Sequence, residues 1–343
     1  MKALYENYSL KNVYRQTQTY SDDYLIGLFN QLRKSPPGWV PNQVNPDTIT
    51  DSTSNHHIST PQRLKIVPDL LPTRHKLIIG DSKMMSEVAD NSVHLMVTSP
   101  PYYNAPHDYK GLFSSYDAYL ELLECVANEA YRVLEPGRIA AINIDDMLVD
   151  GDKYPIVADT TTIFKKAGFR YRDCIQWKKP DGYIRASRRS GNLVKHLSPM
   201  YYYPDNILES IIIFQKGRFD YKSIDPAIKS RSSLDINEIQ DGKWVLNFWE
   251  MKNVLPRSDL EKGIAAFPEE LPYRLIKLYS HTGETVLDPF MGSGTTMKVA
   301  KLLARNSIGI EFNKSCLPVI RNKIGFADDY VDEAGNEFEL VIR

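Results

Sequence analysis

Two stretches set the architecture of this 343-residue chain: Thr98-Ser99-Pro100-Pro101-Tyr102-Tyr103-Asn104 and Asp288-Pro289-Phe290-Met291-Gly292-Ser293-Gly294-Thr295-Thr296. Each follows an apolar run of strand character and therefore marks the carboxyl end of a strand, where α/β proteins place their ligands. Because two such strands can belong to one sheet, we expect the two loops to line opposite walls of a single cleft.

Strand and helix patterns alternate around both loops, which favours an α/β fold with a doubly wound, mostly parallel sheet covered on both faces. The alternation lapses between about 178 and 264, apart from one strand at 210–214, and we interpret this stretch as an insertion. Pro136-Gly137 is expected to close the first helix and Gly168 the second. Apolar runs predict strands at 76–79, 94–97, 139–144, 171–177, 210–214, 285–287 and 307–310, and helical spacing predicts helices at 116–134, 156–166, 269–280, 292–304 and 313–323.

Composition excludes several classes of protein. Apolar residues make up 42% of the chain, enough for a substantial core, but no run approaches the roughly 18 residues of a membrane span. Residues 1–19 are too polar for a signal peptide, so we expect a cytoplasmic protein. The three cysteines are odd in number and far apart, and neither His107 nor His56-His57 has a partner at metal-ligand spacing, so neither disulfides nor a metal are expected.

The glycine-rich loop is not a nucleotide triphosphate site. A P-loop needs Lys before the hydroxyl residue, but Thr295 directly follows Gly294. A dinucleotide fingerprint would want a third glycine at position 297, which is Met. The loop is distinguished instead by Asp288-Pro289-Phe290 ahead of its glycines.

Together the two loops resemble the catalytic and S-adenosylmethionine loops of β-class DNA amino-methyltransferases, in which the catalytic loop comes first in sequence. The resemblance covers roughly residues 76–325 and implies a circularly permuted, Rossmann-like sheet with a DNA target-recognition insertion. It implies sequence-specific methyl transfer from S-adenosylmethionine to the N4 amine of a flipped cytosine in double-stranded DNA, within a restriction-modification system. Adenine N6 is the alternative target; protein-glutamine or RNA methylation and a non-catalytic DNA-binding module are disfavoured by the motif order and the intact motifs.

The resemblance also assigns the cofactor contacts. Asp288 and the glycine turn hold the amino-acid part, Glu311 the ribose hydroxyls, Asp81 the adenine amino group, and Phe267 one wall of the methionine pocket. The alternatives are that Glu311 caps the following helix, that Asp81 forms an ordinary turn, and that Phe267 precedes a plain helix start. The expected set is Asp81, Phe267, Asp288, Pro289, Phe290, Gly292, Ser293, Gly294, Thr295, Glu311 and Phe312, the last of these stacking on adenine.

The first loop suits transfer to an exocyclic amine, whose lone pair is delocalised into the base. Ser99 and the Pro100 carbonyl can accept hydrogen bonds from the amine, Pro101 stiffens the turn, and Tyr102 can stack on an extruded base. A neutral serine acceptor favours cytosine N4 over adenine N6. No cysteine follows a proline, which excludes carbon-5 chemistry. Alone, the loop could be an ordinary polyproline turn. Asp145 and Asp146 either orient Ser99, line the target pocket or are surface carboxylates.

DNA contact is expected from the insertion, because the net charge of −1 leaves only a local patch to bind phosphates. Alone, the basic stretch could be an ordinary solvated loop. Trp244 and Trp249 are expected in the local core. The chain then divides into an extension (1–65), a catalytic domain (66–177, 206–217, 264–326), a target-recognition region (178–205, 218–263) and a tail (327–343). A cognate restriction endonuclease is the expected partner, with a monomer and a homodimer both open. The predicted DNA-binding residues are Lys178, Lys179, Tyr183, Arg185, Arg188, Arg189, Asn192 and Lys195.

Overall fold

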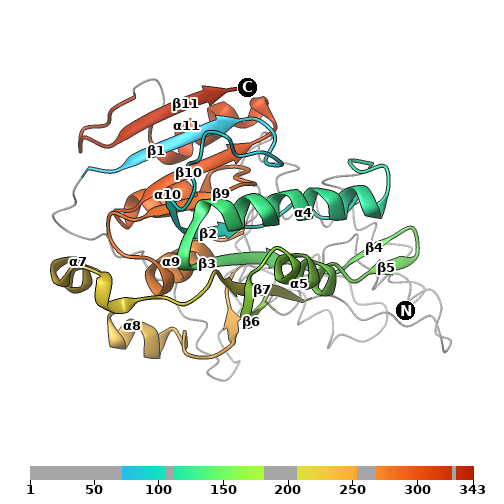
Figure 1. The fold of residues 1–343 in the computed structure, drawn as a ribbon, viewed down its shortest axis with the longest axis horizontal. Helices are drawn as coiled ribbons and strands as arrows, with labels where there is room; N and C mark the ends of the chain where they lie inside the picture. Colours follow the sequence, from blue (N-terminus) through green and yellow to red (C-terminus); the bar gives the residue numbers. More distant parts are fainter. Residues whose placement is uncertain (1–71, 106–110, 181–206, 253–266, 327–329) are drawn as a thin grey trace, which may run out of the picture. The chain divides into compact units, whose positions relative to one another are not determined.

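One nine-stranded sheet organises the computed structural model, which describes residues 72–105, 111–180, 207–252, 267–326 and 330–343 (Figure 1). These ranges all belong to the unit Leu64–Arg343, and the predicted extension lies outside them. The strand order is β11-β1-β10-β9-β2-β3-β7-β6-β8. The strands are β1 (Arg74–Ile79), β2 (Val93–Thr98), β3 (Leu134–Ile144), β6 (Arg170–Lys178), β7 (Leu208–Gln215), β8 (Phe248–Glu250), β9 (Thr285–Asp288), β10 (Asn306–Glu311) and β11 (Glu337–Ile342), with a separate hairpin of β4 (Met147–Val149) and β5 (Asp152–Tyr154).

The sheet is parallel except at β7, which runs antiparallel to both β3 and β6. From β9 the chain continues through α10 to β10, its neighbour on one side, whereas from β2 it continues through α4 to β3 on the other. The winding direction therefore reverses between β9 and β2, which makes their carboxyl ends the switch point of the sheet. The predicted mostly parallel, doubly wound sheet is confirmed.

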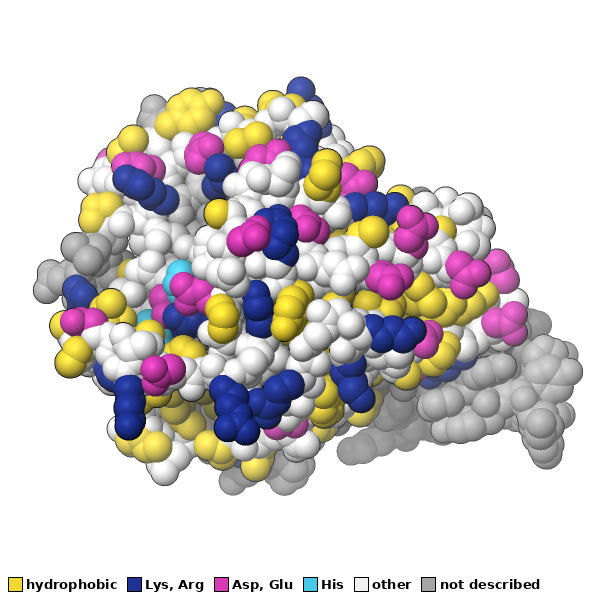
Figure 2. Space-filling view, viewed as in Figure 1, with side chains coloured by type: hydrophobic (Ala, Val, Ile, Leu, Met, Phe, Trp, Pro, Cys, Tyr) yellow, Lys and Arg dark blue, Asp and Glu magenta, His cyan; other side chains and the backbone are white. Residues whose placement is uncertain are grey.

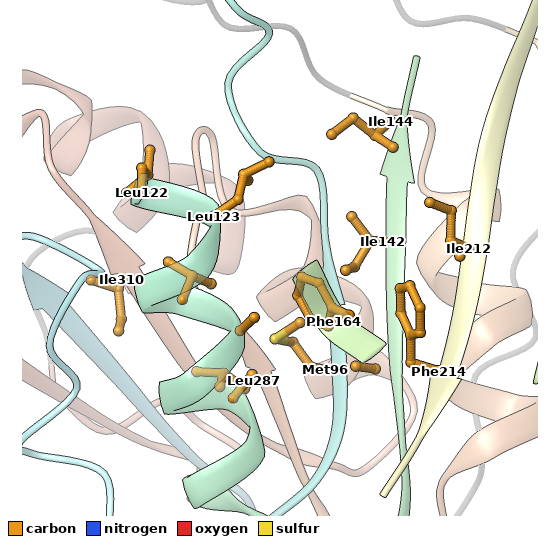
Figure 3. Packing of buried hydrophobic residues seen from close by; sticks show 14 of the residues in the cluster. Met96, Leu122, Leu123, Ile142, Ile144, Phe164, Ile212, Phe214, Leu287 and Ile310 are labelled. Atoms are coloured by element: carbon orange, nitrogen blue, oxygen red, sulfur yellow. The ribbon is translucent and has the colours of Figure 1, made fainter. Parts of the chain in front are cut away.

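Helices cover both faces of the sheet, and the alternation of side chains along each strand assigns the faces. Met96, Ile142 and Phe214 pack with α4 and α5 (Figure 3). Leu95 and Val97 face the other way and pack in the cluster that contains α9 and part of α10. Within the described residues no helix is both long and apolar enough to cross a membrane. The helices are α4 (Tyr116–Val133), α5 (Ile156–Lys166), α7 (Pro226–Arg231), α8 (Ile236–Asp241), α9 (Glu270–Tyr279), α10 (Thr295–Leu302) and α11 (Leu317–Ile324), with short 3-10 turns η3 (Tyr221–Ser223) and η5 (Lys314–Cys316).

Local signals account for the boundaries of α4 only in part. Ser115 caps its N-terminus, because the hydroxyl accepts a hydrogen bond from the Ala118 amide at 3.1 Å. The predicted closure by Pro136-Gly137 is wrong, since β3 already begins at Leu134 and includes both residues. Gly137 has φ of +91°, and a Cβ there would lie 2.6 Å from the Phe219 Cα, so this bend in the strand requires glycine.

Within the described residues the sequence patterns missed the hairpin strands β4 and β5 and two strands of the nine-stranded sheet. The predicted C-terminal tail contains β11, which pairs in parallel with β1 along its whole length. The predicted target-recognition region contains β8, which pairs with β6. Trp244 and Trp249 are 4% and 1% exposed in the cluster with α9, so their expected core placement is confirmed. The part of the chain from Trp244 to Met251 therefore completes the sheet and its core, which corrects its assignment to DNA recognition alone.

Adjacent residues of β8 test this role. Trp249→Ala removes a buried indole and should lower the free energy of unfolding by about 3–5 kcal/mol in urea titrations. Phe248→Ala is the matched control, because Phe248 is 42% exposed and its loss should cost less than about 0.5 kcal/mol. Equal effects of the two changes would contradict the placement of β8 in the sheet.

Candidate active site

The two loops singled out in the sequence leave the same edge of the sheet from neighbouring strands. β2 and β9 pair directly, with Leu95 opposite Val286 and Met96 opposite Leu287. At their carboxyl ends the Thr98 hydroxyl donates a hydrogen bond to the Asp288 Oδ1 at 2.7 Å. The predicted juxtaposition of the two loops is thus confirmed for the strand ends from which they emerge.

Asp288 joins three parts of the site. Its Oδ1 also accepts from the Phe290 amide at 3.1 Å, and its Oδ2 accepts from the Thr296 hydroxyl at 2.6 Å, which fastens the loop to α10. The side chain is only 2% exposed. Burial raises the pKa of Asp288 to about 6, although the three donors act in the opposite direction. Sequence reasoning missed Thr98; its only signal was a hydroxyl at the last position of an apolar strand.

The glycine turn has the conformation that its sequence predicts. Gly292 and Gly294 have φ of +54° and +88°, and Gly294 is the residue before α10, so side chains would be strained at both positions. The Ser293 and Thr295 hydroxyls accept hydrogen bonds from the Lys323 Nζ of α11 at 2.6 and 3.1 Å. Both side chains are thus held by the protein itself, through a lysine that sequence reasoning did not identify.

Glu311 ends β10 and lies beside this turn. Its Oε2 accepts from the Gly292 amide and its Oε1 from the Asn313 amide, each at 2.8 Å. Burial raises the pKa of Glu311, and these amides partly counteract the effect. Because Asn313 caps the next turn, the carboxylate combines the helix-start role with contact to the glycine loop. Phe312 is 77% exposed, so its ring is accessible.

The end of β1 completes this side of the edge. Ile79 pairs with Glu311, and the exposed Asp81 forms a turn in which its Oδ1 accepts from the Lys83 amide at 2.9 Å. The Ser82 hydroxyl donates to the Pro289 carbonyl, which ties the β1 loop to the Asp288 loop. The ordinary-turn interpretation of Asp81 is therefore present in the structure, and it places the carboxylate next to the Glu311 strand.

Two further predicted cofactor residues, Phe290 and Phe267, pack against the hydrophobic core. Phe290 is half-buried and packs against the cluster that contains α4. Phe267 is 8% exposed and packs in the α9 cluster, so in this structure it mainly supports the helix that follows it. Its predicted place in the wall of a methionine pocket remains a prediction.

The predicted catalytic loop packs against aromatic side chains. Tyr102 and Tyr103 are 3% and 7% exposed in the α4 cluster, and the Asn104 side chain exchanges two hydrogen bonds of 2.9 Å with the Phe113 backbone. Ser99, by contrast, is partly exposed, and no hydrogen bond from a described residue reaches its hydroxyl. The Tyr102 ring does not present an open face in this structure, so its stacking on a base remains a prediction.

Two further carboxylates follow β3, the strand next to the catalytic loop. Asp146 accepts a hydrogen bond from the Val157 amide at 3.0 Å and thereby serves the start of α5. Asp145 is 8% exposed and accepts from the Asp146 amide at 2.8 Å. The alternative that these are surface carboxylates is wrong for Asp145. A role in orienting Ser99 or lining the target pocket remains a prediction.

The structure corrects one DNA-binding assignment. Lys179 is 4% exposed and forms an ion pair with Glu209, because a cation buried this deeply needs a counter-charge. Lys178 is more accessible and pairs with Glu250 at 3.2 Å. On the face that Figure 2 presents, Lys and Arg are interspersed with Asp and Glu. The other predicted DNA contacts, Tyr183, Arg185, Arg188, Arg189, Asn192 and Lys195, lie outside the described residues.

Comparisons with known proteins agree with this geometry. A family model described as DNA methylase matches residues 93–322. The type II methyltransferase M.MjaI of Methanocaldococcus jannaschii is 37% identical, over 74% of this chain and 92% of its own length. M.MthZI of Methanothermobacter thermautotrophicus is 33% identical, over 74% and 77%. A Thermus thermophilus protein described as a putative DNA modification methylase, solved with S-adenosyl-L-methionine, matches with a TM-score of 0.61 and 26% identity, over 78% of this chain and 98% of its own.

The buried Asp288 carboxyl predicts a pH dependence of stability. Its pKa is raised from 3.8 to about 6, so the native state binds the proton more tightly than the unfolded state, and the stabilisation is lost as pH rises through about 6. Asp288→Asn removes this titration. The free energy of unfolding of the variant relative to wild type should therefore increase between pH 4 and pH 7 in urea titrations. Parallel pH profiles of the two proteins would contradict the assignment.

Proposed function

Because this chain belongs to the DNA methylase family, and is thus an S-adenosylmethionine-dependent DNA amino-methyltransferase, we propose that it methylates the N4 amine of a cytosine flipped out of double-stranded DNA. One observation carries the proposal. Ser99, a neutral acceptor, stands partly exposed at the switch point, one residue after the hydrogen bond that joins Thr98 to Asp288. Adenine N6 is the alternative target.

The residues at the edge of β1, β10 and β9 fit the cofactor. The left-handed Gly294 opens the N-terminus of α10, where backbone amides favour a carboxylate, and the exposed Phe312 offers a ring for adenine. We assign the ribose hydroxyls to Glu311 and the adenine amino group to Asp81. Asp288 positions the loop through its three hydrogen bonds. When bound, S-adenosylmethionine supplies an activated methyl group on a cationic sulfur.

In the proposal, the catalytic loop makes the target amine more nucleophilic. The lone pair of an exocyclic amine is delocalised into the base, and acceptors at its two hydrogens favour the pyramidal nitrogen that can attack. Ser99 Oγ and the Pro100 carbonyl are these acceptors in the proposal, and Pro101 keeps the turn stiff because its ring fixes φ. A hydroxyl is a weaker acceptor than a carboxylate, which suits the more polarised cytosine amine and supports N4 over N6.

The names of the relatives support a proposal for the biological setting. Two of them carry the name type II methyltransferase, which supports a modification enzyme of a restriction-modification system with a cognate endonuclease as partner. We propose a cytoplasmic, sequence-specific enzyme that reads double-stranded DNA through 178–205 and the part of 218–263 outside β8 and its core contacts. Within this region the basic residues from Arg185 to Lys195 neutralise phosphates, and Tyr183 fills the space left by the flipped base.

The reaction itself is tested by incubating the protein with labelled S-adenosylmethionine and duplex DNA, then digesting the DNA to nucleosides for mass spectrometry. N4-methylcytosine is the expected product. Ser99→Ala should lower kcat by at least about 100-fold, with little change in cofactor affinity, because the hydroxyl acts mainly on the reacting amine. N6-methyladenine would transfer the proposal to the alternative base, and label on RNA or protein would overturn it.

The correction of Lys179 yields a second test. Arg188→Ala with Arg189→Ala should weaken DNA binding and reduce the slope of log affinity against log salt by about 2, at unchanged stability. Lys179→Met is the contrast, because it leaves Glu209 buried without this ion pair and should cost about 3–5 kcal/mol of unfolding free energy. A stable Lys179→Met protein with weakened DNA binding would restore the original assignment.

A further inference from the structure

A chain of buried polar groups ends beside the catalytic loop. The Lys179 ammonium pairs with Glu209, and the Asn143 Nδ2 donates to the other Glu209 oxygen at 2.7 Å. The three side chains are 4%, 6% and 2% exposed. Burying an ion pair costs desolvation and is often no more stabilising than apolar packing, so a site that retains one invites a functional explanation.

The oxygen of the Asn143 side-chain amide has no hydrogen-bond partner among the described residues. A carboxylate only accepts hydrogen bonds, so the contact with Glu209 identifies the Nδ2 of Asn143 and thereby the position of its Oδ1. This Oδ1 is buried and has no hydrogen-bond partner among the residues that the structure describes. Because an unpaired buried acceptor is costly, a donor is expected within its reach.

Sheet register points to Ser99 as the candidate donor. Thr98 pairs with Ile142 in the parallel strands β2 and β3, so the next residues, Ser99 and Asn143, are neighbours. Val97 and Ala141 both belong to the α9 cluster and therefore share a face of the sheet. Ser99 precedes a proline and so keeps an extended backbone, which continues the alternation and places Ser99 on the face of Asn143.

We propose that Asn143 is a positioning residue for Ser99. When DNA is engaged, the Asn143 Oδ1 accepts the hydrogen of the Ser99 hydroxyl, which turns a lone pair of Ser99 Oγ toward the target amine. Glu209 and Lys179 hold the Asn143 amide in the required orientation. This inference rests on the proposed role of Ser99, and it adds one residue each from β3, from β7 and from the position directly after β6 to the site, without any covalent step.

A double-mutant cycle tests the coupling. Steady-state kcat and the dissociation constant for S-adenosylmethionine are measured for wild type, Ser99→Ala, Asn143→Leu and the double variant. Asn143→Leu should lower kcat about tenfold in the wild-type background, and change it by less than about twofold when Ser99 is already Ala. Cofactor affinity should stay within about twofold in all four proteins. A purely structural role would give the same factor in both backgrounds and would overturn the proposal.

Two further variants serve as controls for this experiment. Asn143→Asp combined with Glu209→Gln exchanges the amide and the carboxylate, which keeps an acceptor oxygen at position 143 and a hydrogen bond between the two side chains. This double change should recover at least about a third of the wild-type kcat, and a loss as large as that of Asn143→Leu would overturn the proposal. If Asn143→Leu melts at a markedly lower temperature, Asn143→Ala takes its place in the cycle. A wild type that methylates no DNA amine would overturn the proposed function, whereas an active wild type with additive effects overturns only the role of Asn143.

Discussion

A buried carboxylate holds the centre of this protein together. Asp288 lies at the end of β9, away from water, and its charge is tolerated only because hydrogen bonds arrive from Thr98, the Phe290 amide and Thr296. These donors come from the neighbouring strand, the turn and the first helical residues after it. Satisfying one carboxylate therefore fixes the glycine turn, the start of α10 and the base of the catalytic loop relative to one another.

Because the strands are parallel, the polar residues at their carboxyl ends form one edge of the sheet around Asp288. Parallel strands bring all their carboxyl ends to one side of the sheet. In the spatial order β1, β10, β9 and β2, Asp81 and Ser99 lie just after the ends of β1 and β2, and Glu311 and Asp288 are the last residues of β10 and β9. The glycine loop and the loop that begins at Ser99 are nearly 200 residues apart in the sequence. They meet because the winding of the sheet reverses between β9 and β2.

The insertion shows how poorly charge alone assigns function. Lys179 is part of a basic stretch, yet it is buried against Glu209 at the end of β6, and the tryptophan of β8 packs in the core beside the same strand. Residues that look like one DNA-binding surface in sequence thus serve two purposes. Trp249 completes the core, and Lys179 belongs to a buried polar chain with Glu209 and Asn143.

Local pattern alone determined much of this protein, including most elements of the sheet, the limits of α5, both loops and the family resemblance. Apolar periodicity and glycine turns are encoded within a few residues, so they can be read without a structure. Tertiary structure alone decided the rest. The strands β8 and β11, the burial of Lys179, the partner role of Thr98 and the unpaired oxygen of Asn143 all depend on which distant strands pair. Pairing between distant segments leaves no local periodic signal, because each partner satisfies its hydrogen bonds and charge only once the sheet has formed.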